Sequence, residues 1–466
     1  MKKKTKFLSK LLISDIASQG KCIARHEDKV IFVENAAPGD IVNVRITKDK
    51  KKFAEAKIVS FESLSPNRET PFCKHFGICG GCKWQHLPYQ QQLAFKEKEV
   101  IDNFERIGKL TFPKPKAIIP SPNTTFYRNK LEYTFSSKRW LTKEEIDSGL
   151  ELERNALGFH APGRFDKIID IETCYLQNEV SNRIRNAVKS YAHENKIPFF
   201  DLVKQEGFLR NLIIRNSNTE ELMVILQVFA EKETEGLLNL LQFIKNQFPE
   251  ITALQYVLNT KGNETFYDLE VKTFSGKDYI TEEMEGLKFR IGPKSFFQTN
   301  AVQAYELYKI ARAFAELKGV ETVYDLYTGT GTIANFVSKQ AQKVVGVESV
   351  EMAVEDAKKN AALNGINNTR FFAGDMKDIL NENFSIEHGK PDVIITDPPR
   401  AGMHEKVVQA LLDLAPQRLV YVSCNPATQA RDLALLDTAY QITAVQPVDM
   451  FPHTYHVENV VKLVRR

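Results

Sequence analysis

The sequence is poor in long apolar runs. Its longest apolar stretch, LMVILQVFA at residues 222–230, is far shorter than the roughly 18 residues that a membrane-spanning helix needs. The basic start of the chain resembles a signal peptide, but Ser9, Lys10, Ser14 and Asp15 interrupt the apolar segment that such a peptide requires. We therefore expect a cytosolic protein with no membrane partner.

Cysteine is scarce as well. Six cysteines in 466 residues are too few for a disulfide scaffold. Hydrophobic residues at 43% and charged residues at 26% match an average soluble protein, which excludes a disordered chain or a coiled coil. The chain is too long for one ordinary hydrophobic core, so we expect two or three domains.

Net charge is also small, but it is unevenly distributed. The overall charge of +4 divides into +13 for residues 1–140 and −9 for residues 141–466. This uneven charge favours an N-terminal domain that binds a polyanion, joined to a separate catalytic domain. The alternative is a lysine-rich face that is merely solvated.

Five short strand-like segments lie within residues 8–61, separated by the turn-forming stretches NAAPGD and KDKKK. Five strands in so short a segment predict a small closed barrel of the oligonucleotide-binding kind. At residues 39–61, GDIVNVRITKDKKKFAEAKIVSF, the segment resembles the TRAM module of RNA-modifying enzymes. On that interpretation four lysines would contact RNA phosphates without reading sequence: Lys48, Lys50, Lys51 and Lys52.

The rest of the sequence divides into two regions with different patterns. Residues 67–285 combine a cysteine-rich segment, a helical stretch near 88–107 and a mixture of strands and helices, which predicts an α+β domain. From residue 286 onward strand and helix alternate regularly, as in a doubly wound α/β sheet of the Rossmann-like kind. We expect three domains: 1–66, 67–285 and 286–466.

A glycine-rich turn follows the first strand of the expected α/β sheet, in DLYTGTGT at residues 325–332. Gly329 and Gly331 allow the backbone to approach a cofactor closely. Glu348, at the end of the next strand, suits the hydroxyl groups of a ribose, and Asp375, at the end of the following strand, could accept from an adenine amino group. A dinucleotide would fit these signals too.

A second turn favours a methyltransferase. Asp397-Pro-Pro-Arg400 follows the apolar strand DVIIT, and its prolines stiffen a turn that holds Asp397 at the lip of the pocket. Amino-methyltransferases use a related turn, whereas a dehydrogenase has no need of one. The structural alternative is a strand that simply stops at a proline.

A cysteine and a glutamate suit methylation of carbon 5 of uracil. Cys424 ends the strand RLVYVS at the same rim, and its thiolate could add to carbon 6 and so activate carbon 5 toward a sulfonium methyl group. A base must then remove the carbon-5 proton, and Glu458 is the candidate, although spacing does not show that it lies near Cys424. A DNA or protein amino-methyltransferase does not need Cys424. A non-catalytic RNA-binding or ribosome-assembly factor needs neither residue.

Three of the cysteines form a separate cluster in the sequence, with a fourth further on. The four are Cys73, Cys79, Cys82 and Cys174. Four thiolates are the usual ligands of an iron–sulfur cluster. A structural zinc site, with His75 and His86 as further ligands, is the alternative that the residues leave open.

Six motifs together resemble the RNA uridine-5-methyltransferase family. They are SFFQTN at 295–300, DLYTGTGT at 325–332, VGVES at 345–349, TDPPR at 396–400, SCNPAT at 423–428 and HVENVVKL at 456–463. The resemblance covers essentially the whole chain. The barrel and the cysteine segment are similar to the 23S ribosomal RNA (uracil-5)-methyltransferases rather than to the transfer-RNA branch.

The resemblance implies Cys424 as the nucleophile, Glu458 as the proton acceptor, S-adenosylmethionine as the methyl donor and a [4Fe-4S] cluster on the four cysteines. It also implies a cofactor pocket lined by Gln298, Tyr327, Thr332, Glu348, Asp375 and Asp397. Gln298 and Asp397 could face the uracil instead, and Thr332 stands where relatives often carry Asn. We expect a monomer that acts on 23S ribosomal RNA, with uridine-5 methylation of transfer RNA as the alternative.

Overall fold

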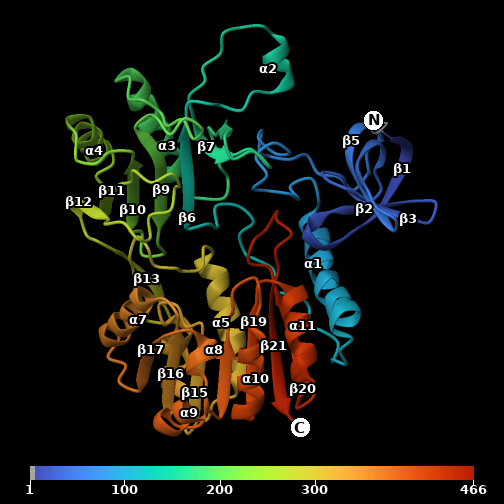
Figure 1. The fold of residues 1–466 in the computed structure, drawn as a ribbon, viewed down its shortest axis with the longest axis vertical. Helices are drawn as coiled ribbons and strands as arrows, with labels where there is room; N and C mark the ends of the chain where they lie inside the picture. The colour runs from blue at the N-terminus through green and yellow to red at the C-terminus, as the bar shows by residue number, and fades with distance from the viewer. Residues whose placement is uncertain (1–5) are drawn as a thin grey trace.

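The computed structural model describes residues 6–466, so the first five residues of the expected barrel domain lie outside the described part. Figure 1 shows three bodies: a barrel at the N-terminal end, a sheet with helices in green, and a second sheet with helices in orange and red. A long helix, α1 (Tyr89–Asn103), runs beside the third body and leads down from the barrel (Figure 1).

The N-terminal body is a closed five-stranded barrel, as the sequence predicts. Its strands follow the order β1-β2-β3-β5-β4. Alternate residues at the start of β4, Val42 and Val44, are fully buried, because side chains of a strand point in turn to the inside and the outside. Strand β1 also buries Ile13, although an irregularity in its register interrupts the alternation. The elements are β1 (Phe7–Ile16), η1 (Ser18–Gly20), β2 (Cys22–His26), β3 (Lys29–Val33), β4 (Ile41–Asp49) and β5 (Phe53–Ser63).

The second body is a seven-stranded sheet in the order β12-β11-β10-β9-β6-β7-β8, with helices packed against it. Helix α4 connects the parallel pair β10 and β11, and the other pairs are antiparallel, which agrees with the expected α+β arrangement. The strands are β6 (Lys130–Ser136), β7 (Ala156–His160), β8 (Ile168–Asp170), β9 (Leu209–Asn216), β10 (Leu222–Val228), β11 (Ala253–Leu258) and β12 (Lys272–Gly276). The helices are α2 (Lys143–Asp147), α3 (Glu179–Glu194) and α4 (Glu235–Gln247).

The third body confirms the predicted doubly wound sheet. Its order is β17-β16-β15-β18-β19-β21-β20; the first five strands are parallel, whereas β21 runs antiparallel between β19 and β20. The strands are β15 (Thr322–Leu326), β16 (Lys343–Glu348), β17 (Thr369–Ala373), β18 (Val393–Thr396), β19 (Arg418–Ser423), β20 (Tyr440–Val448) and β21 (Glu458–Arg465). The helices are α5 (Ala301–Ala315), α6 (Thr332–Val337), η3 (Ser338–Gln340), α7 (Glu351–Leu363), α8 (Met376–Ile379), α9 (Glu382–His388), α10 (Glu405–Leu414) and α11 (Pro426–Leu436).

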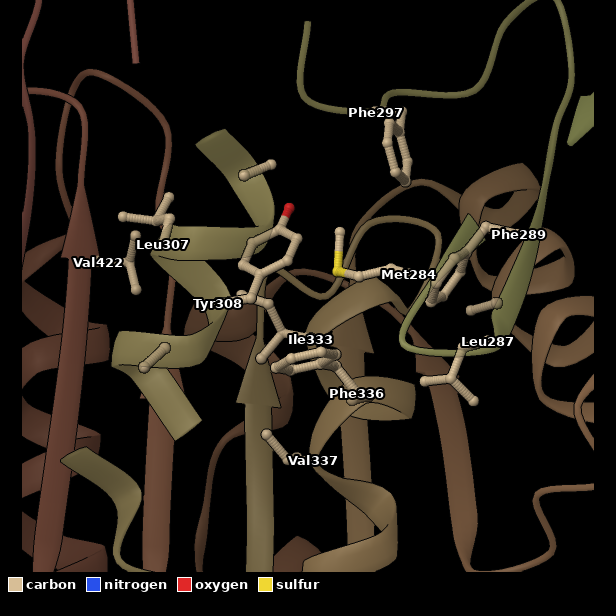
Figure 2. Packing of buried hydrophobic residues seen from close by; sticks show 14 of the residues in the cluster. Met284, Leu287, Phe289, Phe297, Leu307, Tyr308, Ile333, Phe336, Val337 and Val422 are labelled. Carbon is tan, nitrogen blue, oxygen red and sulfur yellow. The ribbon is translucent and has the colours of Figure 1, made fainter. Parts of the chain in front are cut away.

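One face of this sheet is covered by α5, α6 and α7. Figure 2 shows Tyr308 of α5 near Phe336 of α6, and Leu307 of α5 beside Val422. A two-stranded hairpin, β13 (Ile280–Met284) with β14 (Leu287–Ile291), buries Met284 and Phe289 in the same cluster. The opposite face is covered by α10 and α11 and by a segment from much earlier in the chain.

That early segment is α1 (Tyr89–Asn103), which continues as a π-helical turn, η2 (Phe104–Gly108). Val100 and Phe104 are fully buried in the same cluster as Leu433 of α11. The positions of the expected domain boundaries stay predictions. Among residues 6–466, no helix is long and apolar enough to cross a membrane.

Asp40 connects the barrel, through hydrogen bonds, to the segment that follows its last strand. Its buried carboxylate accepts from the backbone N–H groups of Ala37 and Ser65, at 2.6 and 2.9 Å, and from the Arg68 guanidinium at 2.7 and 2.8 Å. Burial opposes its charge, but the Arg68 and backbone hydrogen bonds outweigh burial and lower its pKa.

We predict that Asp40→Asn destabilises the barrel by about 3 kcal/mol at pH 7, because Arg68 loses its buried partner. A carboxyl with a lowered pKa stabilises the fold above its unfolded pKa of about 4, so the difference from wild type should shrink below that pH. Urea unfolding in a Trp140→Phe background would measure it through Trp84, which packs in the barrel core. Asp28→Asn, at an exposed turn, is the control; equal stability of both variants would contradict the prediction.

Candidate active site

Two neighbouring strands bring Cys424 and Glu458 to the same corner of the C-terminal sheet. Strand β19 ends at Ser423, which is paired with Asn459 of the antiparallel strand β21. Cys424 follows the first strand directly, and Glu458 is the first residue of the second. The turn after Cys424 is fixed by Asn425, whose side chain accepts from the backbone N–H of Ala427 at 3.1 Å and caps α11.

The electrostatics of this corner bear on nucleophile chemistry. Burial, together with the nearby Glu458 and Asp397 carboxyls, raises the pKa of the Cys424 thiol to about 12. The Arg400 guanidinium acts in the opposite direction, through its charge and a hydrogen bond to the sulfur. Glu458 is only 4% exposed, and burial and then Asp397 raise its pKa well above the usual range.

Two further carboxyls crowd the same region. Burial and the proximity of Asp325 raise the pKa of Asp397 to about 7. Burial also raises the pKa of Asp325 to about 7, although one of its oxygens accepts from the Thr328 hydroxyl and from the backbone N–H of Ala334. Several buried acidic groups therefore lie close together, with Arg400 near Cys424 and Glu458, an arrangement typical of sites that move protons.

Tyr308 of α5 lies against these carboxyls. Its pKa is raised well above the usual range by burial and then by Asp397, Asp325 and Glu458. In Figure 2 its hydroxyl points away from the apolar side chains packed below it.

The glycine-rich turn leaves backbone open beside this corner. Gly329 and Gly331 have φ angles of +54° and +75°, which side chains rarely permit. A Cβ at Gly331 would meet Ala357 at 2.8 Å, whereas a Cβ at Gly329 would point into open space. The backbone N–H of Gly329 donates to Glu348 Oε2 at 3.1 Å, so the end of β16 and the turn are held together.

The other predicted pocket residues lie on both sides of this turn. Burial and then Asp375, Asp432 and Glu348 raise the pKa of Tyr327 to about 12, so Tyr327 lies close to two of the predicted pocket carboxylates. Asp375 itself is exposed, caps α8 and pairs with Lys377 at 2.7 Å.

Thr332 and Gln298 are less directly connected to the pocket. Thr332 is buried at the start of α6, with its hydroxyl 3.3 Å from that of Thr330. Gln298 lies in the loop before α5, where the Asn129 side chain donates to its carbonyl oxygen at 3.0 Å. The direction of the Gln298 side chain stays a prediction.

Sequence reasoning did not single out Arg400, Asp325 or Tyr308. Arg400 and Asp325 lie inside the motifs TDPPR and DLYTGTGT. The signal that could have pointed to them is a charged residue at the end of a buried strand. Tyr308 gives no such signal, because its spacing in α5 is that of an ordinary core residue.

The four clustered cysteines line one cavity of about 320 Å³. His75 and Arg128 line it too, and His75 Nε2 and Arg128 Nε are buried without a hydrogen-bond partner among the described residues. Cys174 is held in place because its N–H donates to Asn182 Oδ1 at 2.9 Å. Within residues 6–466 no three cysteine, histidine or acidic side chains converge as closely as one metal ion requires, so a metal site is not shown.

The surface between the barrel and the cysteine segment is hollowed. A groove of about 600 Å³ is lined by Lys57 and Phe61 of β5 and, across from them, by Lys83 and Trp140. The predicted phosphate-contacting lysines at 48 and 50–52 are all exposed.

Two family models match this chain. The model described as tRNA (Uracil-5-)-methyltransferase matches residues 268–466, and the TRAM domain model matches residues 10–59. The second match supports the TRAM resemblance of the barrel, and the first covers every motif of the glycine-rich turn and the cysteine corner.

Two relatives that match over nearly their full length are named as RNA methyltransferases. A protein of Bacteroides thetaiotaomicron named an uncharacterized RNA methyltransferase is 59% identical over 97% of this chain and 100% of its own. A protein of Porphyromonas gingivalis with the same name is 56% identical over 97% of this chain and 99% of its own.

A solved structure is similar over nearly the whole chain. The tRNA (uracil-54, C5)-methyltransferase of Pyrococcus abyssi, in complex with S-adenosyl-L-homocysteine, is 29% identical, covers 97% of this chain and 99% of its own, and has a TM-score of 0.76. The chain therefore belongs to the RNA uracil-5-methyltransferase family, with a TRAM domain ahead of its methyltransferase domain.

Proposed function

We propose that this enzyme methylates carbon 5 of a uridine in RNA through a covalent bond between Cys424 and carbon 6, and that Glu458 removes the carbon-5 proton. The observation that carries the proposal is the pairing of β19 with β21, which sets the thiol and the buried carboxyl at one corner. Neither amino-group methylation nor a purely structural role in ribosome assembly would require this pair.

S-adenosylmethionine is the proposed methyl donor, and it supplies an electrophilic methyl group on a sulfonium when bound. The open space at Gly329 and the buried Asp325 Oδ1, which has no partner among the described residues, fit a ligand at the glycine-rich turn. Glu348 would accept from the ribose hydroxyls and Asp375 from the adenine amino group. Tyr327, Thr332 and Gln298 complete the proposed lining.

The thiolate of Cys424 must form against a raised pKa. Arg400 supplies the positive charge and hydrogen bond that favour it, while Glu458 and Asp397 oppose it when they are ionised. Attack of the sulfur on carbon 6 moves an electron pair toward carbon 5 and its adjacent carbonyl. Asp397, with a pKa of about 7, can hold a proton near neutral pH and so stabilise the negative charge that develops there.

Glu458 acts after carbon 5 has received the methyl group. Its carboxylate takes the proton from carbon 5, the electron pair of that C–H bond restores the double bond to carbon 6, and the Cys424 thiolate leaves. A buried carboxylate whose pKa is raised is a stronger base than an exposed one, which suits the removal of a carbon-bound proton.

Glu458→Gln should trap the reaction. The methylated adduct would keep its proton, so a covalent protein–RNA species should accumulate and be visible on denaturing gels. The Glu458→Gln/Cys424→Ala double variant is the matched control and should show no such species. Normal turnover by Glu458→Gln, with no adduct, would remove this glutamate from its proposed role.

For the substrate we propose 23S ribosomal RNA, supported by the resemblance of the cysteine segment to that branch. The solved tRNA enzyme favours a second candidate, because it matches 97% of this chain and so shares the same three-body architecture. The barrel and central domain therefore do not by themselves select ribosomal RNA. In either RNA the target uridine must leave its stack to reach Cys424.

The two candidates are distinguished by mass mapping of 5-methyluridine in cells with and without the gene. We expect the loss of at least one 5-methyluridine in 23S ribosomal RNA, restored by the wild-type chain and not by Cys424→Ala. Loss confined to transfer RNA would instead support the second candidate and overturn the first.

We propose that the barrel and the adjoining groove form the RNA-binding surface. Exposed lysines at 48 and 50–52 offer contacts to phosphates, which are sensitive to salt and blind to sequence. In the groove, Phe61 and Trp140 are placed with Lys57 and Lys83, a combination that suits unpaired bases and their phosphates. Single-stranded or looped RNA is therefore the expected form of the substrate.

We also propose a [4Fe-4S] cluster in the cysteine cavity. One cavity is lined by all four thiols, as a cluster with one iron at each ligand would need, and the two unpartnered nitrogens of His75 and Arg128 line the same space. A cluster also fits thiols that surround a space rather than converge on one atom. Bound there, it would join the segment of Cys73, Cys79 and Cys82 to the loop of Cys174 and so organise the central body.

Protein purified without oxygen should then be brown and contain about four iron and four sulfide ions per chain. Cys174→Ser should lose colour and iron, whereas Cys22→Ser, which alters a buried barrel cysteine outside the cavity, should keep both. Colourless, active protein with one zinc ion per chain would contradict the cluster.

A further inference from the structure

The loop that leads into Glu458 is held by distant parts of the chain. Residues 449–457, here called the Glu458 loop, connect β20 to β21 without forming a helix or strand of their own. Hairpin connections are usually two to five residues long, so a loop of this length needs outside support. His453 within it has a φ of +63°, a conformation that a non-glycine residue keeps only when its surroundings hold it.

The support comes through the backbone. Four consecutive carbonyl oxygens of the Glu458 loop each accept a hydrogen bond from another segment. The donors are Asn300 Nδ2 to Met450 (2.9 Å), Lys96 Nζ to Phe451 (3.0 Å), Tyr127 Oη to Pro452 (3.0 Å), and the N–H groups of Lys83 and Trp84 to His453 (2.8 and 3.0 Å). The path of the loop is thus set by residues outside it.

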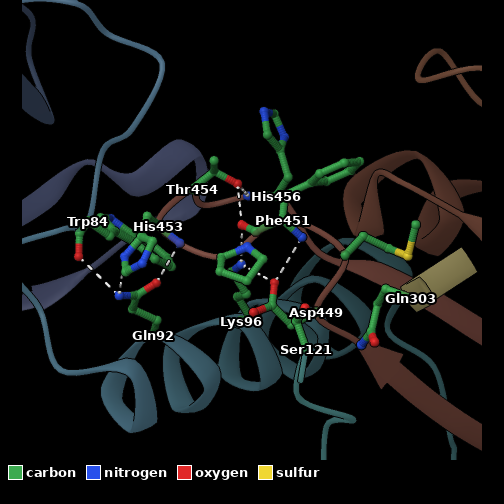
Figure 3. Close-up of polar contacts among 12 residues, drawn as sticks. Trp84, Gln92, Lys96, Ser121, Gln303, Asp449, Phe451, His453, Thr454 and His456 are labelled. Atoms are coloured by element: carbon green, nitrogen blue, oxygen red, sulfur yellow. Dashed lines mark hydrogen bonds and ion pairs between the residues drawn. The ribbon is translucent and has the colours of Figure 1, made fainter. Parts of the chain in front are cut away.

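Helix α1 supplies three side chains that hold the loop: Tyr89, Gln92 and Lys96. Figure 3 shows Gln92 and Lys96, one turn apart, pointing from α1 at the loop above them. Both are fully buried. Lys96 Nζ lies 2.5 Å from Asp449 Oδ1, at the start of the loop, and the second oxygen of Asp449 accepts from the Tyr89 hydroxyl at 2.8 Å.

Gln92 fixes the middle of the loop. Its Oε1 accepts from the backbone N–H of His453 at 2.8 Å, and its Nε2 lies 3.2 Å from His453 Nδ1. The same Nε2 donates to the carbonyl oxygens of Trp84 and Leu87, at 3.1 and 2.9 Å. One neutral side chain therefore joins α1, the segment after the cysteines and the Glu458 loop.

We infer that Gln92 and Lys96 are positioning residues for Glu458: they set the path of residues 449–457 and thereby the place of the carboxylate that takes the carbon-5 proton. The inference rests on the proposed function, because it assigns these residues a role through Glu458. An error of about 1 Å in the position of a catalytic group can cost about 100-fold in rate. Four residues separate His453 from Glu458, so a shift at Gln92 has a short path to the base.

Gln92 is the better residue to change. Removal of Lys96 would leave the fully buried Asp449 without its charged partner, and such variants lose several kcal/mol and can fail to fold. Gln92→Met keeps the length of the side chain and removes its hydrogen bonds. Gln90→Met is the matched control, because Gln90 is the same residue type on the same helix but is exposed.

The experiment is a single-turnover reaction of the full-length enzyme with substrate RNA and S-adenosylmethionine, quenched at intervals and separated on denaturing gels. We expect Gln92→Met to release product about 10- to 100-fold more slowly and to accumulate covalent protein–RNA adduct, as Glu458→Gln does. Gln90→Met should match wild type. A loss of stability alone would lower every step without enriching the adduct.

Three outcomes decide the matter. Adduct in both Glu458→Gln and Gln92→Met supports the inference. Adduct in Glu458→Gln with wild-type behaviour of Gln92→Met overturns the inference and leaves the proposed function standing. No adduct in Glu458→Gln overturns the proposed mechanism, and the inference with it. If Gln92→Met does not fold, Tyr89→Phe replaces it. It removes a single hydroxyl, which donates to Asp449, the loop residue that Lys96 also holds, and accepts from the backbone N–H of Ser121; the same outcomes apply.

Discussion

The antiparallel pairing of β21 with β19 is the interaction on which the candidate active site depends. Parallel strands bring their carboxyl ends to one edge of a sheet. In this way Cys424 and Asp397 directly follow strands, and Asp325 is the next-to-last residue of β15, all at the same edge. Glu458 begins its strand rather than ending one. It reaches the same edge only because β21 runs the other way. A parallel strand in that position would put Glu458 at the far edge of the sheet.

Charge crowding is the second constraint on the site. Burial is the largest cause of the raised pKa at Cys424, Glu458, Asp397 and Asp325 alike, and each group lies near at least one other acidic group. Such an arrangement costs folding free energy, since carboxyls in water would ionise freely. Buried acidic groups with perturbed pKa values are nonetheless common at sites that catalyse proton transfer. Arg400 is the cation that offsets part of this crowding at the sulfur.

Much of the fold could be read from local pattern. Alternating apolar residues and glycine or lysine turns predicted all five barrel strands, and strands that alternate with helices predicted the C-terminal sheet. Local signals also singled out Cys424 and the glycine-rich turn as candidates, because each follows a strand with unusual turn chemistry.

Sequence could not show which distant segments meet. The motif HVENVVKL does not predict that β21 pairs with β19, because the pairing of strands from separate parts of the chain cannot be read from residue spacing. The burial of Gln92 and Lys96 was equally hidden, since polar residues on a helix normally indicate its solvated face. The pattern also gave no sign that α1 packs against α11 of the C-terminal body. By contrast, the sequence already grouped Cys174 with the other three cysteines, and all four line one cavity.

The packing around Trp84 and α1 has a mechanical consequence. Trp84 is buried in the core of the barrel, and α1, which begins five residues later, is buried against the methyltransferase sheet. The barrel is therefore mounted on the catalytic body through packed side chains rather than tethered by a loose linker. If the barrel holds the RNA backbone and Cys424 receives the uridine, as proposed, this packing fixes the distance that the RNA must span between the two places.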